Sequence, residues 1–69
     1  MMIKNSTKTE AVLNEIGARL TQQRGLAKLT QAGLAEKAGV SKRTVERIEA
    51  GNSIQLSTMI QVLRVFNLL

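Results

Sequence analysis

The chain has 69 residues, enough for one small domain with a thin core, because so short a chain buries only about 60% of its unfolded surface. It contains no cysteine, histidine or aspartate, which excludes disulfides, thiolate metal sites and nucleophile–histidine pairs. We therefore expect no metal, no cofactor and no catalysis. Ten Lys and Arg against five Glu give a net charge of +5, which favours an anionic partner such as nucleic acid or a membrane surface.

The beginning of the chain carries no targeting signal that we can identify. Most of its first eight residues are polar, and they lack the apolar run of a signal peptide. No apolar stretch reaches the roughly 18–20 residues that a membrane span needs. We expect a cytoplasmic protein with a flexible arm at residues 1–7 and a single domain at residues 8–69.

The first predicted helix covers residues 8 to about 24. Thr7 and Glu10 have the spacing of a capping box, in which each side chain satisfies a backbone group at the helix start. Apolar residues then recur at helical spacing, at Leu13, Ile16 and Leu20. Gly25 follows and is a weak stop signal.

A second, two-turn helix is predicted at residues 31–38. Thr30 is a suitable N-cap, and Gly39 can adopt the left-handed conformation that ends a helix at little cost. The predicted inward-facing residues are Leu34, Ala35 and Ala38. The small size of Ala35 suits a close approach between two helices.

The third predicted helix covers residues 42–50 and is capped by Ser41. Its inward-facing residues are Val45 and Ile48. Three turn-forming residues, Gly-Asn-Ser at 51–53, end it. Only three residues, 39–41, link it to the second helix, and Val40 is expected to fill the corner beneath that turn. So short a link containing a glycine is typical of a helix-turn-helix, in which the helices cross steeply.

Cationic residues dominate the outward face of the third helix. At about 100° per residue, Arg43 points almost directly away from Val45 and Ile48. Arg47 and Glu46 flank Arg43, and Lys42 lies near the helix start. Arginine can bind guanine O6 and N7 together, and the positive end of the helix dipole favours phosphate. This face is therefore the candidate DNA-binding surface.

A fourth helix is predicted from Thr58 to about Phe66, with Ser57 as N-cap and Asn67 as the left-handed residue at its end. Its polar residues Gln61, Arg64 and Asn67 form one narrow stripe. Apolar residues occupy the rest of the helix surface, which is more than one packing face against the core needs. Some of them should therefore stay exposed on a monomer, and we expect these at a homodimer interface. The candidates are Met59, Val62, Val65, Phe66, Leu68 and Leu69.

Residues 29–51 resemble the phage-repressor (Cro/cI-like, XRE) helix-turn-helix family. The resemblance is carried by Leu-Thr-Gln, Leu-Ala-Glu-Lys, Gly-Val-Ser and Arg-Ile-Glu-x-Gly at these spacings, and it continues more weakly over residues 16–24 and 56–68. It implies an all-α, compact, four- or five-helix lambda-repressor-like DNA-binding domain, with the helix-turn-helix at residues 31–50. The family usually adds a fifth helix and dimerises through that end, whereas this sequence stops at Leu69 and leaves open whether it is part of a longer protein.

The resemblance also implies roles for individual residues. Gln31 would bind a backbone phosphate, and Thr44 would meet a phosphate or a thymine methyl group. Arg24 and Glu49 match a structural pair that ties the first helix to the third. The full set of implied DNA-binding positions is Gln31, Ser41, Lys42, Arg43, Thr44 and Arg47.

Two positions depart from the family pattern. Gly33 stands where an acidic residue is common, and it weakens the second helix by up to about 1 kcal/mol relative to alanine. Lys28 stands where the family often has glycine, so that Gly25 becomes a competing end for the first helix.

The leading interpretation is a sequence-specific regulator of transcription that binds double-stranded DNA and acts as a repressor by occupying an operator. Alternatives are a restriction–modification controller protein, an antitoxin that also represses its own operon, with a toxin protein as partner, and a protein-interaction module that does not bind DNA. A membrane-surface protein is disfavoured because the basic residues lie mostly on the first three helices, whereas the apolar excess lies on the fourth.

Overall fold

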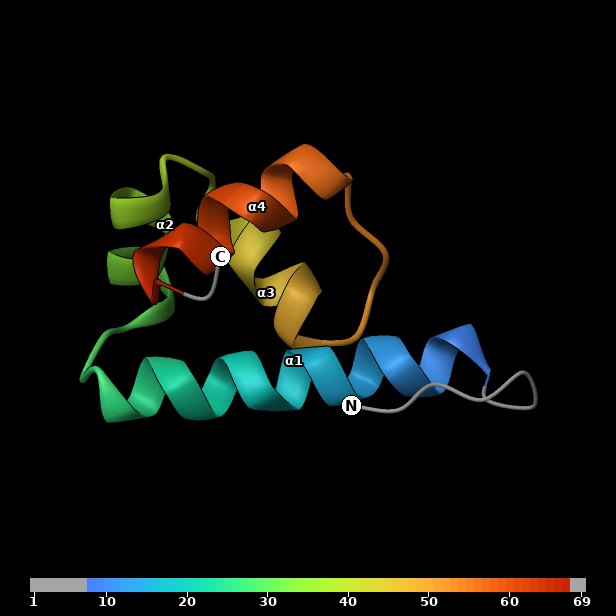
Figure 1. The fold of residues 1–69 in the computed structure, drawn as a ribbon. Helices are drawn as coiled ribbons and strands as arrows, with labels where there is room; N and C mark the ends of the chain where they lie inside the picture. The colour runs from blue at the N-terminus through green and yellow to red at the C-terminus, as the bar shows by residue number, and fades with distance from the viewer. Residues whose placement is uncertain (1–7, 68–69) are drawn as a thin grey trace.

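The computed structural model describes residues 8–67, which form four helices and no strand. Their bounds are α1 Thr9–Leu26, α2 Gln31–Ala38, α3 Lys42–Glu49 and α4 Leu56–Val65. In Figure 1, α1 lies along one side of the molecule and the three shorter helices stack above it. The predicted all-helical fold is thereby confirmed, and the predicted arm at residues 1–7 lies outside the described residues. Within those residues, no helix is long and apolar enough to cross a membrane.

A small core forms where α3 packs against α1 and α2, and where α4 packs against α2. Its buried members are Leu20, Leu34, Ala35, Ala38, Val45, Ile48 and Val62. All five inward-facing positions predicted for the second and third helices are therefore buried. Val40 packs against this core from the turn, whereas Leu13 and Ile16 of α1 are only half-buried.

Two predicted N-caps differ from the structure. The N-cap of α1 is Lys8, whose side chain makes no capping bond, and Thr7 lies outside the described residues. The N-cap of α4 is Gln55, so the helix begins two residues before the predicted start. The N–H of Met59 already donates to the Gln55 carbonyl at 3.0 Å, which places Ser57 inside the first turn instead of before it.

The end of α1 lies at Leu26, so Gly25 does not stop the helix. Lys28 instead adopts the left-handed conformation, with φ 58°. Its N–H donates to the Gly25 carbonyl at 3.0 Å, and the N–H of Leu29 donates to the Arg24 carbonyl at 3.1 Å. These two bonds form a Schellman motif, in which glycine is the usual left-handed residue.

We expect Lys28→Gly to raise the free energy of unfolding by about 0.5–1 kcal/mol. A side chain in the left-handed conformation costs about 1–2 kcal/mol, which exceeds the added backbone entropy of glycine in the unfolded chain. Urea unfolding measures the change. Lys37→Gly, which removes the same charge from a helical position in the last turn of α2, should lower stability by about 0.5–1 kcal/mol. Destabilisation by both substitutions would show that the left-handed conformation of Lys28 carries no cost.

Candidate nucleic-acid interface

The turn between α2 and α3 is defined by two capped helix ends. Gly39 has φ 74°, and the N–H of Val40 donates to the Ala35 carbonyl at 3.0 Å, which ends α2. The Ser41 hydroxyl then accepts the N–H of Thr44 at 3.1 Å and starts α3. A three-residue link with both helix ends satisfied holds α3 in a fixed position against α1 and α2.

The two sides of α3 differ sharply in burial. Val45 and Ile48 are 0% and 1% exposed, whereas Lys42, Arg43 and Arg47 are all exposed. We call these three residues the basic surface. Between residues 8 and 67, no carboxylate lies within ion-pair distance of any of them. Their charges are therefore available to an external anion.

Two hydroxyl groups lie at the start of α3, beside the basic surface. The Ser41 and Thr44 oxygens are 2.9 Å apart, and either can be the donor. Each hydroxyl has a single hydrogen, so this bond uses one of the two and leaves the other for a further acceptor. A phosphate oxygen is a suitable acceptor at a helix N-terminus.

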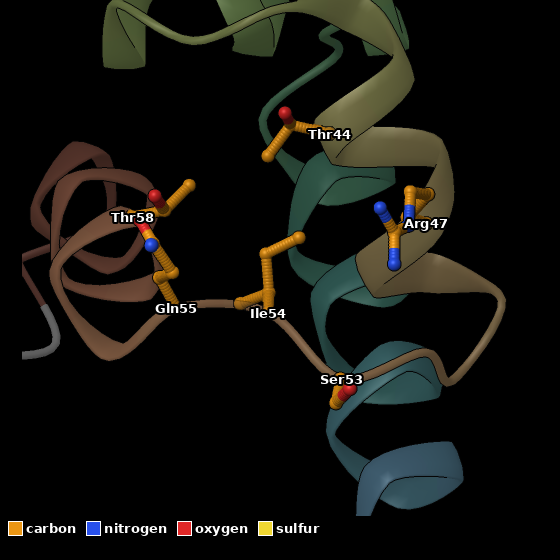
Figure 2. Close-up of a pocket in the computed structure, with 6 residues that line it drawn as sticks. All are labelled: Thr44, Arg47, Ser53, Ile54, Gln55 and Thr58. Carbon is orange, nitrogen blue, oxygen red and sulfur yellow. The ribbon is translucent and has the colours of Figure 1, made fainter.

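A polar groove that the sequence did not indicate lies between α3 and the start of α4. It has a volume of about 490 Å³ and is lined by Thr44, Arg47, Ser53, Ile54, Gln55 and Thr58. Figure 2 shows Thr44 and Ile54 pointing into it from opposite sides. The α3–α4 loop was predicted only as a helix stop. Its position beside Arg47 extends the candidate interface beyond the helix-turn-helix.

Arg24 and Glu49 join the end of α1 to the end of α3. The Arg24 Nε and Nη2 atoms donate to the two Glu49 oxygens at 2.7 and 3.2 Å, and Nη1 donates to the Leu29 carbonyl at 3.0 Å. The carboxylate also accepts the Gln31 amide at 3.1 Å. The ends of α1 and α3 and the start of α2 are thus connected through a single carboxylate.

The charges in this network stabilise one another. Burial raises the pKa of Glu49, but hydrogen bonds from Arg24 and Gln31 outweigh it and leave that pKa below its ordinary value. The hydrogen bond to Glu49 likewise raises the pKa of Arg24. The Gln31 amide group has two hydrogens, so its bond to Glu49 leaves one for the phosphate contact that the resemblance implies.

The residues predicted for a dimer interface occupy different environments. Val62 is fully buried in the core, because it lies on the side of α4 that meets α2, and so it is not available to a second chain. Met59, Val65 and Phe66 are half-buried and pack against the core. Leu68 and Leu69 lie outside the described residues. Among the described residues, the large apolar side chains with the greatest exposure are Leu26 and Leu56, at 72% and 76%.

Two short helices joined by a glycine turn, with an open basic surface on the second, define a helix-turn-helix DNA-binding protein. A profile of the helix-turn-helix family matches residues 20–68, more than half of the chain. The chain therefore belongs to this family, whose Cro/cI-like, XRE-type members are DNA-binding regulators and not catalysts. Among curated proteins there is no significant match.

Proposed function

We propose that this protein is a cytoplasmic repressor that binds a specific operator sequence in double-stranded DNA. The observation that carries the proposal is the basic surface, which is exposed on the side of α3 away from Val45 and Ile48 and pairs with no carboxylate of the described part of the chain. Arginine can donate two hydrogen bonds to guanine O6 and N7 in the major groove, and lysine can reach the same acceptors or a phosphate. We assign base reading to Lys42, Arg43 and Arg47.

Three further residues are proposed to set the position of α3 on the duplex. Gln31, at the first position of α2, keeps one amide hydrogen after its bond to Glu49. Ser41 and Thr44 share one hydrogen bond and keep one hydroxyl hydrogen between them. Donors of this kind bind phosphate oxygens and fix register without reading sequence.

The regulator is proposed to act as a homodimer through the end of α4. The half-buried Met59, Val65 and Phe66 are the described residues that support this, because each can lose further apolar surface to a second chain. A two-fold dimer would place two α3 helices one DNA turn apart, about 34 Å, and would read a pseudo-palindromic site.

Selection of bound sites from random duplex DNA tests the proposed function directly. We expect enrichment of two half-sites in inverted orientation, with centres about one helical turn apart, and weaker binding as salt rises. A single enriched half-site would contradict the dimer. If no duplex were enriched, the proposal would be wrong, and the protein-interaction alternative would be favoured.

Arg43→Ala and Arg47→Ala are each expected to weaken binding to the selected site by about 1–3 kcal/mol and to relax the preference at one base pair. Fluorescence anisotropy with labelled duplex measures the affinity. Arg19→Ala is the matched control, because it removes the same charge from the exposed side of α1, where Arg19 pairs with Glu15 at 2.8 Å. Unchanged affinity of the Arg47 variant would show that the DNA-binding surface is assigned to the wrong face.

A further inference from the structure

Glu46 is an acidic residue on the face of α3 that carries the basic surface. It is exposed, and on the helical wheel it lies on one side of Arg43 while Arg47 lies on the other. We infer that Glu46 determines specificity by accepting a hydrogen bond from the N4 amino group of a cytosine in the major groove. This inference rests on the proposed DNA-binding function.

The surroundings of α3 leave Glu46 free. Val45 and Ile48 are buried in the core, and Thr44 lines the groove between α3 and α4. Glu49 accepts hydrogen bonds from Arg24 and Gln31. None of the side-chain bonds within residues 8–67 involves Glu46. Its carboxylate therefore enters the same space as the basic surface when α3 approaches DNA.

An ion-pair role for Glu46 does not fit the structure. Two other glutamates form ion pairs: Glu15 with Arg19 at 2.8 Å and Glu49 with Arg24 at 2.7 Å. Glu46 has Lys42 four residues before it and Arg43 three residues before it, both close enough on a helix surface to pair. Nevertheless neither cation lies within ion-pair distance, and a lysine that precedes a glutamate by four residues has the less favourable order.

The chemistry of the major groove gives this carboxylate a selective effect. An ionised carboxylate only accepts hydrogen bonds, and it is repelled by phosphate. Guanine presents the acceptors N7 and O6, thymine presents O4, and adenine presents a donor beside the acceptor N7. Cytosine presents only the N4 donor. Glu46 should therefore oppose binding to most base pairs and permit it where a cytosine faces this position.

Selection from random duplex DNA with the wild type, Glu46→Ala and Glu46→Gln tests the inference. We expect the wild type to prefer cytosine about tenfold at one position of each half-site. Glu46→Ala should lose this preference, and Glu46→Gln should move it towards adenine, whose N6 and N7 match an amide. Glu36→Gln is the control, because it removes the same charge from an exposed position on α2 and should leave every base preference unchanged.

The outcomes separate this inference from the function on which it rests. If the wild type selects a site and Glu46→Ala selects the same site with the same preferences, the role of Glu46 is refuted and the proposed function stands. Weaker binding by Glu46→Ala with unchanged preferences would indicate that Glu46 only orients neighbouring cations, which also refutes the inference. If the wild type selects no site, both proposals fail.

Discussion

Replacing Gly17 with alanine is expected to lower the free energy of unfolding by about 2 kcal/mol. Gly17 is buried where α1 crosses the end of α3. A Cβ atom there would lie 2.6 Å from the Ile48 carbonyl oxygen and 2.8 Å from that of Glu49. Both are backbone atoms, so the helices must separate, and overpacking of this kind typically costs about 1–3 kcal/mol or more. The intrinsic helix preference of alanine, about 1 kcal/mol, offsets only part of that cost.

Gly25→Ala is the matched control, because the same substitution is made in the same helix. Apart from its chain neighbours and the backbone of its own helix, no atom of residues 8–67 lies within 4 Å of a Cβ at Gly25, so alanine there should raise stability by about 0.5–1 kcal/mol. Thermal unfolding followed by circular dichroism should show a Tm about 10 °C lower for Gly17→Ala and a few degrees higher for Gly25→Ala. A similar change of Tm in both variants would mean that close helix contact at Gly17 is not required.

Gly17 also illustrates what periodicity leaves undetermined. From the sequence alone, a glycine inside an apolar helical pattern is expected only to lower the stability of the helix. A structural role was predicted for Gly25 instead, as a signal that ends the first helix. The need for glycine at position 17 arises from two carbonyl groups of α3, more than thirty residues later in the chain. Such a contact depends on how two helices cross, which spacing within either helix does not specify.

The exposed face of α3 was predictable because burial of Val45 and Ile48 fixes the rotation of a regular helix. The same reasoning failed for Val62. On α4 the apolar residues exceed a single packing face, so the pattern did not say which of them meet α2. The groove beside Arg47 was not predictable either, since it depends on the path of residues 50–55, which have no regular period.

Arg24→Ala is expected to lower the free energy of unfolding by about 2–4 kcal/mol. The Glu49 side chain is only 7% exposed and that of Arg24 20%, so the substitution leaves a largely buried carboxylate without its cation. It also removes the donor to the Leu29 carbonyl. Arg19→Ala breaks an ion pair whose side chains are 62% and 49% exposed, and it should cost less than about 1 kcal/mol. Equal losses in urea unfolding of the two variants would contradict a structural role for Arg24.

The pH dependence of stability should separate the charge of Glu49 from its hydrogen bonds. Because the pKa of Glu49 is lowered in the folded protein from its ordinary value of 4.5, its stabilising effect is complete above that value and is lost as the pH falls through the lower folded-state pKa. Glu49→Gln keeps an acceptor for Arg24 but cannot titrate. We therefore expect the stability advantage of the wild type over Glu49→Gln to be greatest near neutral pH and to shrink below about pH 4.5. An advantage that stays constant down to pH 3 would show that the charge of Glu49 contributes nothing to the link between α1 and α3.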